Sequence, residues 1–149
     1  MASFGFIETY YRLNKKEYKI ILVLVALLCL SITALDLKKL HPYEYIYFNK
    51  IGGGVRLANG KFPVDYWGAS FKEASDWVLK DSENSEYETF VMTCNSTAAV
   101  EYYGRSKFEV TNEKQKANYI ICQDTVKDLE PTYEVKRNNV VLNSVYKVN

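Results

Sequence analysis

The sequence is poor in the residues that build metal sites and disulfide frameworks. Its 149 residues include three Cys, one His and two Met. These leave too few nitrogen and sulfur ligands for a dedicated zinc site, and three Cys cannot staple a small secreted fold. Nineteen Lys+Arg balance eighteen Asp+Glu, so the net charge is +1. Because a nucleic-acid binder needs a basic excess on one face, we expect no nucleic acid as partner. We also expect no metal or other cofactor.

The abundant residues are apolar and aromatic. Hydrophobic residues make up 48% of the chain and charged residues 25%, which is typical of a folded chain rather than a disordered one. The length suits one domain of ordinary size, or a smaller domain with an appendage. Thirteen Tyr and seven Phe form an unusual excess that needs a structural explanation.

The longest apolar run predicts a transmembrane helix over residues 18–37. Ile20–Leu35 contains no charged residue. With its flanks the run has about twenty residues, roughly 30 Å of helix, which matches a bilayer core. It lacks the polar stripe that a soluble core helix would show. Ser31 and Thr33 are mildly polar, but a helix satisfies such hydroxyls by bonding them back to its own carbonyls.

Two other interpretations of this run stay open, a signal peptide and a buried soluble helix. A signal peptide also has a basic N-terminal side, but its apolar core is shorter and no A-x-A-like cleavage site follows here. Four basic residues precede the run and two follow it closely, which favours a single-pass protein with its C-terminal part outside the cytoplasm. Residues 1–17 show a loose helical spacing of aromatic side chains, which indicates an interfacial helix, a frayed cytoplasmic tail or the tail of something larger.

Residues 38–68 form a Tyr- and Gly-rich membrane-proximal segment. Pro42 disfavours helix at the preceding residue, so the span should end by about Leu40. If the next piece is extended, alternate tyrosine rings share one face, and such rings concentrate at the membrane boundary. Three consecutive glycines predict a loop, and neither a P-loop nor a dinucleotide fingerprint is present. The expected membrane-interface or lipid contacts are His41, Tyr43, Tyr45, Tyr47, Phe48, Gly52, Gly53 and Gly54.

The remaining residues, 69–149, predict a small extracytoplasmic α/β domain that opens with a helix from Ser70 to about Lys80. Ser70 and Glu73 fit a capping box, in which the hydroxyl and the carboxylate cover orphan backbone donors. Apolar residues recur at helical spacing behind this cap, which predicts a buried face. That face consists of Phe71, Ala74 and Val78, broadened by Trp77.

The pattern after this helix predicts a mixed sheet with a C-terminal β-hairpin. Strands are expected at 89–94, 108–110, 117–122, 133–137 and 140–148, with a short helix from 97 to 103. Gly104 is expected in the left-handed conformation that ends the helix, and Asn138-Asn139 in the hairpin turn. Cys94 and Cys122 end two strands, so they either pair in an oxidising compartment or remain buried thiols. Asn95 begins an N-glycosylation acceptor sequence, which matters only in a eukaryotic lumen.

Two stretches, HPYEYIYFN (41–49) and FPVDYWGASFKEASDWVLK (62–80), resemble the C-terminal region of bacterial multi-spanning glycosyltransferases of the dolichyl-phosphate-mannose protein mannosyltransferase type, in the glycosyltransferase C superfamily. In that group the last membrane helix is followed by a similar tyrosine-rich stretch and by a DYWG–KEA–W combination. The closing YEVKRNNVVLNSVYKVN is similar to their final hairpin. The motif residues in this chain are Asp65, Tyr66, Trp67, Gly68, Lys72, Glu73 and Trp77.

The resemblance implies transfer of a sugar from a polyprenyl-phosphate donor to an acceptor outside the cytoplasm. The family's chemistry is carried by an acidic residue in the first external loop of a many-helix body. No residue here matches that acid, so we assign no catalytic residue. We expect Asp65 to fix the turn before the helix and Glu73 to cap it.

The resulting expectation is a C-terminal portion of a membrane glycosyltransferase that is non-catalytic alone and positions donor or acceptor at the outer membrane face. Its partners would be membrane lipid, a polyprenyl-phosphate sugar and a multi-spanning catalytic subunit. An alternative is a single-pass anchored interaction module, unrelated to sugar transfer, that binds a protein or peptide through a sheet edge or the Tyr-rich face. A third is a secreted α/β protein released by signal cleavage.

Overall fold

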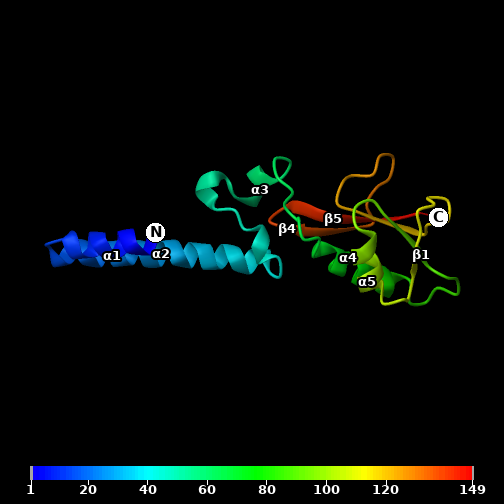
Figure 1. Ribbon diagram of the computed structural model, residues 1–149, viewed down its shortest axis with the longest axis horizontal. Helices are drawn as coiled ribbons and strands as arrows, with labels where there is room; N and C mark the ends of the chain where they lie inside the picture. The colour runs from blue at the N-terminus through cyan, green and yellow to red at the C-terminus, as the bar shows by residue number, and fades with distance from the viewer. Residues whose placement is uncertain (1, 149) are drawn as a thin grey trace. The chain divides into compact units, whose positions relative to one another are not determined.

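The computed structural model describes residues 2–148 (Figure 1). The chain divides into two compact units, one that extends through His41 and one that begins at Pro42. The second unit contains a mixed α/β fold, as the sequence predicts. Because the unit begins at Pro42, most of the Tyr- and Gly-rich segment is part of the same compact body as the sheet.

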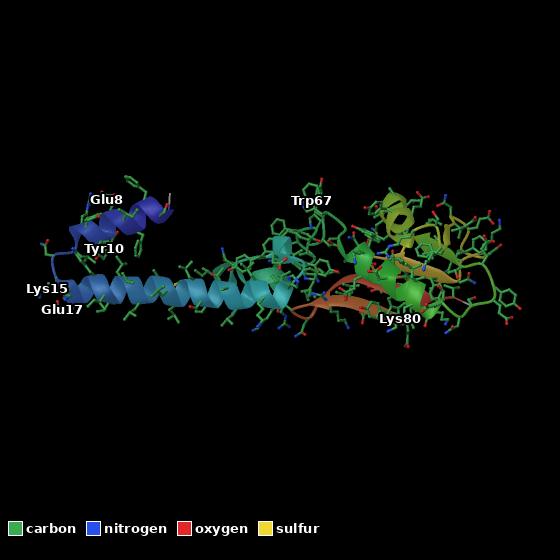
Figure 2. All side chains as sticks on the ribbon, turned by 90° about the horizontal axis from the view of Figure 1, so that it is seen from below. Glu8, Tyr10, Lys15, Glu17, Trp67 and Lys80 are labelled. Carbon is green, nitrogen blue, oxygen red and sulfur yellow. A yellow bond between two sulfur atoms is a disulfide. The ribbon has the colours of Figure 1, made fainter. Side chains whose placement is uncertain are left out.

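The first unit is a pair of helices, α1 (Ala2–Arg12) and α2 (Lys16–Leu40). α1 folds back beside the first turns of α2 (Figure 2), where the Lys19 ammonium lies 5.0 Å from the centre of the Tyr10 ring. α2 ends at Leu40, so the expected end of the apolar helix is confirmed.

α2 has 25 residues and is long and apolar enough to cross a membrane. The two hydroxyls in its apolar run are satisfied within the helix, since Ser31 Oγ donates to the carbonyl of Leu27 (2.8 Å) and Thr33 Oγ1 donates to that of Cys29 (3.0 Å). A signal sequence near the N-terminus can also reach this length and apolarity, so the helix is compatible with both a membrane span and a signal sequence.

The second unit opens with short helices where the sequence predicts extended chain and a loop. They are η1 (Glu44–Ile46), η2 (Lys50–Gly52) and α3 (Gly54–Ala58). The condition under which the tyrosine rings would share one face is therefore not met, because Glu44–Ile46 forms a 3₁₀ turn and not extended chain. The loop expectation is wrong. Gly53 adopts φ 91°, and this left-handed geometry lets the chain pass directly from η2 into α3.

Helix α4 (Ser70–Asp81) follows, and its boundaries agree with the sequence prediction. The chain then builds a five-stranded mixed sheet with the order β2-β1-β3-β5-β4. β1 pairs in parallel with β2 and β3, whereas β5 pairs antiparallel with β3 and β4. The remaining elements are β1 (Phe90–Thr93), α5 (Thr97–Gly104), β2 (Glu109–Val110), β3 (Tyr119–Cys122), β4 (Tyr133–Arg137) and β5 (Val140–Lys147).

Helices α4 and α5 cover one face of this sheet, and the connection from β3 to β4 covers the other (Figure 1). The predicted face of α4 is confirmed, because Phe71, Ala74 and Val78 are at most 1% exposed. On the opposite face Ile120, Cys122 and Tyr146 form a cluster. The β3–β4 connection covers that cluster with Val126 and Leu129.

The two turns around the sheet differ in how well the sequence predicts them. Asn138 and Asn139 have φ 49° and 62°, which confirms the hairpin turn. Gly104 is the last helical residue of α5, and Arg105 takes the left-handed conformation (φ 53°), so the expected role of Gly104 is wrong. The glycine is required for a different reason: a Cβ there would lie 2.6 Å from Phe108 Cε2.

A disulfide joins Cys94, just after β1, to Cys122 at the end of β3. Their Cα atoms lie 5.1 Å apart across the parallel strand pair. Of the two states that the sequence leaves open, the structure has the paired one. Cys29 on α2 is a free, exposed thiol.

Candidate functional site

The motif residues meet the tyrosine-rich segment in one polar cluster, which we call the tyrosine–carboxylate cluster. It lies where the chain just after Pro42, the start of α4 and the β4–β5 hairpin converge. Its centres are the two carboxylates Glu73 and Asp65, around which the donors are arranged. The members are Tyr43, Tyr45, Asp65, Ser70, Glu73, Gln123, Tyr133, Arg137 and Asn143.

Glu73 accepts hydrogen bonds from three residues that are far away in the sequence. Tyr43 Oη donates to Oε2 at 2.9 Å and Tyr133 Oη donates to Oε1 at 2.9 Å. Arg137 Nη2 donates to Oε2 at 2.7 Å, and the Arg137 guanidinium also lies 4.7 Å from the centre of the Tyr43 ring. The carboxylate therefore joins η1, α4 and β4.

These contacts change the protonation equilibria of the residues that make them. Burial alone would raise the pKa of Glu73, but the hydrogen bonds from Tyr43, Tyr133 and Arg137 outweigh it and hold that pKa below its ordinary value. Burial and the bond to the carboxylate raise the pKa of Tyr43 and that of Tyr133. At neutral pH Glu73 is thus an anion bound by neutral phenols and a cation.

Asp65 is buried and accepts donors from both the backbone and side chains. Oδ1 accepts the Ala69 N–H (3.2 Å) and Oδ2 accepts the Ser70 N–H (3.3 Å), so Asp65 covers two orphan donors at the start of α4. Its carboxylate also accepts the hydroxyls of Tyr45 and Ser70. Burial, together with that bond, raises the pKa of Tyr45. The expectation that Asp65 fixes the turn before the helix is confirmed.

The capping box is wrong, and the reason is competition for its two side chains. Ser70 Oγ bonds to Asp65 instead of the helix backbone, and the Glu73 carboxylate is occupied by the phenols and Arg137. Asp65, five residues before Ser70, provides the cap in their place. A spacing rule within the helix could not identify a cap that comes from the preceding loop.

Two amide side chains complete the cluster, the half-buried Gln123 and the fully buried Asn143, and sequence reasoning identifies neither of them. Gln123 Nε2 donates to the backbone carbonyl of Asp65 at 3.1 Å and to its Oδ2 at 3.2 Å. Asn143 Nδ2 donates to Ser70 Oγ at 3.2 Å, while Asn143 Oδ1 is buried without a partner in the structure. A signal was available for Asn143, because a buried polar residue interrupts an apolar run in β5.

The other motif residues divide into a packed group and an exposed group. Trp77 stacks on Tyr133 with ring centres 5.3 Å apart and an angle of 6°. Gly68 adopts φ 64°, and a Cβ there would lie 3.0 Å from the Phe71 ring. By contrast, Tyr66 and Trp67 are 74% and 77% exposed, and Trp67 points away from the ribbon (Figure 2).

The residues that we expect to contact lipid also differ in how exposed their side chains are. Tyr43 is 3% exposed, whereas Tyr45 and Phe48 are 42% and 37% exposed. Tyr43 and Tyr45 direct their hydroxyls to carboxylates of the cluster. Contact of these side chains with lipid stays a prediction, and it applies best to those whose rings are exposed.

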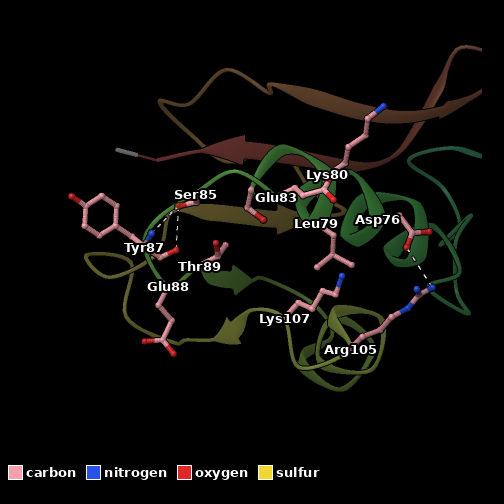
Figure 3. Close-up of a pocket in the computed structure, with 11 residues that line it drawn as sticks. Asp76, Leu79, Lys80, Glu83, Ser85, Tyr87, Glu88, Thr89, Arg105 and Lys107 are labelled. Carbon is pink, nitrogen blue, oxygen red and sulfur yellow. Dashed lines mark hydrogen bonds and ion pairs between the residues drawn. The ribbon is translucent and has the colours of Figure 1, made fainter.

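Two hollows lie beside the motif residues. One of about 560 Å³ borders the cluster at Asp65 and is lined by the 59–66 loop, Gln123 and Asp124, with Val141 and Leu142 behind. The other, of about 550 Å³, lies beyond α4 and carries mixed charges, with Asp76 and Arg105 3.9 Å apart at its rim (Figure 3). The second hollow is lined mostly by charged and polar side chains, whereas the first combines apolar side chains such as Phe62 and Val141 with polar ones.

The cluster is built to hold elements together rather than to carry out acid–base chemistry. Each carboxylate already accepts several donors, and the pairing with Arg137 helps to hold the pKa of Glu73 low, so Glu73 is not poised to take a proton from a substrate. No group of His, Cys, Asp and Glu that could hold a metal ion occurs among residues 2–148. Comparisons of the chain with protein-family models, curated proteins and solved structures find no match.

Proposed function

We propose that this chain is the C-terminal, extracytoplasmic portion of a polyprenyl-phosphate-sugar-dependent membrane glycosyltransferase. In this role it transfers no sugar by itself. It positions the lipid-linked donor or the acceptor at the outer membrane face for a multi-spanning catalytic subunit. The apolar helix α2 would anchor it in the membrane.

One observation carries the proposal: the two stretches on which the family resemblance rests bind each other. Tyr43 from the first stretch bonds to Glu73 from the second, and Tyr45 bonds to Asp65 in the same way. If the residues of a motif stabilise the same part of the structure, they should contact one another in the fold. The contacts support a common task for the motif, namely to fix the tyrosine-rich chain onto α4.

The disulfide supports the proposed placement outside the cytoplasm. Cys94 and Cys122 are bonded in the sheet, and such bonds persist in oxidising compartments. This agrees with the orientation indicated by the basic residues before α2.

The sheet edges give less support to the alternative of an interaction module that adds a peptide strand. β2 forms one edge with only two residues. β4 forms the other, with a register shift between Val135 and Lys136 and a charged end at Arg137. Short, irregular and charged edges are those that proteins use to prevent strand addition.

Two measurements test the proposal. The reconstituted chain is incubated with a polyprenyl-phosphate sugar and membrane acceptors, and we expect no transfer; transfer by the chain alone would refute the proposal. In native membranes, cross-linking should capture a many-span protein that carries an acidic external loop. Glu73→Ala should lose that capture because the cluster is broken, whereas Lys72→Ala, an exposed neighbour that pairs with Asp76, should keep it. Dominant capture of any other class of protein would contradict the proposal.

A further inference from the structure

Most of the exposed large apolar side chains of the second unit lie in one short stretch of the chain. Ile51 is fully exposed at 102%, and Trp67 is 77% exposed. Exposed apolar groups concentrated in this way mark a surface that contacts something other than water. The six side chains of this stretch, here called the apolar segment, are Phe48, Ile51, Leu57, Phe62, Tyr66 and Trp67.

The apolar segment is an ordered surface. Phe48 stacks on Phe62 with ring centres 6.2 Å apart, which joins the two ends of the η2–α3 excursion. Tyr66 and Trp67 pack edge to face at 5.3 Å. Because α3 also buries Val55 against the domain, the exposed side chains are held by a folded support.

The exposed charges of this stretch have a single sign. Between Phe48 and Trp67 the chain contains Lys50, Arg56 and Lys61, and its one acidic residue, Asp65, is buried. The stretch 81–88 has the opposite character, with four acidic residues and no basic one, and it lies at the end of the domain away from α3 (Figure 1). Basic side chains among exposed aromatic and aliphatic ones match an anionic lipid surface, in which cations meet phosphates and rings enter the headgroup layer.

We propose that the apolar segment docks onto the anionic lipid headgroups of the bilayer that α2 enters. The apolar segment follows α2 closely in the chain: its first ring, Phe48, lies eight positions after Leu40, a distance of at most about 30 Å even in extended chain. The docking would hold the domain against the membrane. The inference deepens the proposed function, but physically it requires only that α2 lies in lipid.

The two tryptophans of the chain allow a direct test. The full chain is reconstituted into liposomes of phosphatidylcholine and phosphatidylglycerol, with ordinary or brominated acyl chains. With excitation selective for tryptophan, Trp77→Phe reports on Trp67, and Trp67→Phe reports on the packed Trp77. We expect bromine to reduce the Trp67 emission about twofold and ordinary lipid to shift it to shorter wavelength, because an interfacial ring lies within reach of the acyl chains. Trp77 emission should not change between the two lipids.

Charge variants test whether the apolar segment binds anionic lipid. Arg56→Glu with Lys61→Glu should abolish the bromine quenching of Trp67, whereas Lys80→Glu with Lys107→Glu, at the rim of the hollow in Figure 3, should leave it unchanged. Quenching should also weaken in liposomes of phosphatidylcholine alone.

A second probe does not depend on replacing Trp77. A spin label is attached at Ile51→Cys or, as the matched control, at Tyr87→Cys, both in a Cys29→Ala chain in which the other two cysteines are bonded. Both positions are highly exposed, so neither change disturbs the core. We expect oxygen in the bilayer to reach the label at 51 and an aqueous relaxation agent to reach the label at 87.

The outcomes separate this inference from the proposed function, since the liposomes contain neither donor nor catalytic subunit. A chain that co-sediments with liposomes while Trp67 stays unquenched and position 51 stays water-accessible would overturn the docking alone. Shielding of Trp67 from both water and bromine, as by a second protein copy, would also overturn it. A chain that fails to associate with liposomes would overturn both.

Discussion

Tyr43 Oη donates a hydrogen bond to Glu73 Oε2 at 2.9 Å, and these two residues are separated by 30 positions in the sequence. Arg137 binds the same carboxylate oxygen and lies over the Tyr43 ring. The three side chains connect the first residues of the domain, the first turn of α4 and the end of β4. A substitution at Glu73 therefore releases three elements at once.

Replacing Glu73 with Ala should lower the free energy of unfolding of the domain by about 2–4 kcal/mol. The reason is that Arg137 loses its ion pair with Glu73, and the hydroxyls of the buried Tyr43 and the half-buried Tyr133 lose their acceptor. Urea unfolding of the full chain in detergent, followed by near-ultraviolet circular dichroism of the aromatic residues, measures the change. A loss of less than about 0.5 kcal/mol, typical of an exposed charge, would contradict the structure.

The same carboxylate makes stability depend on pH in a defined direction. Because the folded-state pKa of Glu73 lies below its ordinary value of 4.5, its contribution is complete above that pH and is lost as the pH falls through the folded-state value. The domain should therefore lose stability in acid, and Glu73→Gln should lose less between neutral pH and acid than the unchanged chain. Equal pH slopes for the two proteins, measured in the same urea titrations, would be inconsistent with this role.

Asp65→Ala should destabilise the domain by roughly 2–3 kcal/mol, since α4 loses its cap and the hydroxyls of Tyr45 and Ser70 lose their acceptor. Asp76→Ala is the matched control on the same helix, because Asp76 makes only exposed ion pairs, and its effect should stay within about 0.5 kcal/mol. Thermal unfolding of both variants gives the comparison. Similar losses at the two positions would refute the capping role of Asp65.

The elements that the sequence predicts well are those with local signals. The periodicity of α4, the apolar strands and the Asn138-Asn139 turn follow from neighbouring residues, and the structure has them at the expected places. The cluster could not be predicted in this way. The position of Glu73 after Ser70 suits a capping box. Residues 30 to 64 positions away bind its carboxylate instead.

The three consecutive glycines show a second reason why local sequence does not predict every element of the fold. Three consecutive glycines indicate a loop because glycine weakens regular structure. Here the freedom of Gly53 serves a tight passage between two helices, where a Cβ would lie 2.0 Å from Leu57 Cδ1. This close approach depends on tertiary packing around α3, and the local amino-acid composition does not indicate it.

Breaking the disulfide should lower the free energy of unfolding by roughly 3–4 kcal/mol, the value expected for closing a loop of this length in the unfolded chain. Cys94 and Cys122 are 28 positions apart. The variant Cys94→Ala with Cys122→Ala is compared with Cys29→Ala, which removes only the free thiol. If all three proteins unfold at the same urea concentration, the bond does not stabilise the domain.

Gly104→Ala should be destabilising by about 1–3 kcal/mol, although alanine normally favours a helix over glycine. The new methyl would collide with the ring of Phe108, which lies 2.6 Å from the Cβ position. Phe108→Leu should therefore recover part of the loss in the double variant. If the second change instead adds its full cost to the first, the collision is not the cause.

Alkaline carbonate extraction of membranes, combined with mass measurement of the chain, tests most directly whether α2 (Lys16–Leu40) lies in lipid. We expect the uncleaved chain to remain in the membrane pellet, because a helix of this length and apolarity, once inserted, is not released by alkali. Recovery of the uncleaved chain in the supernatant, or of a shorter chain that has lost the apolar helix, would contradict the membrane anchor and with it the proposed placement of the domain.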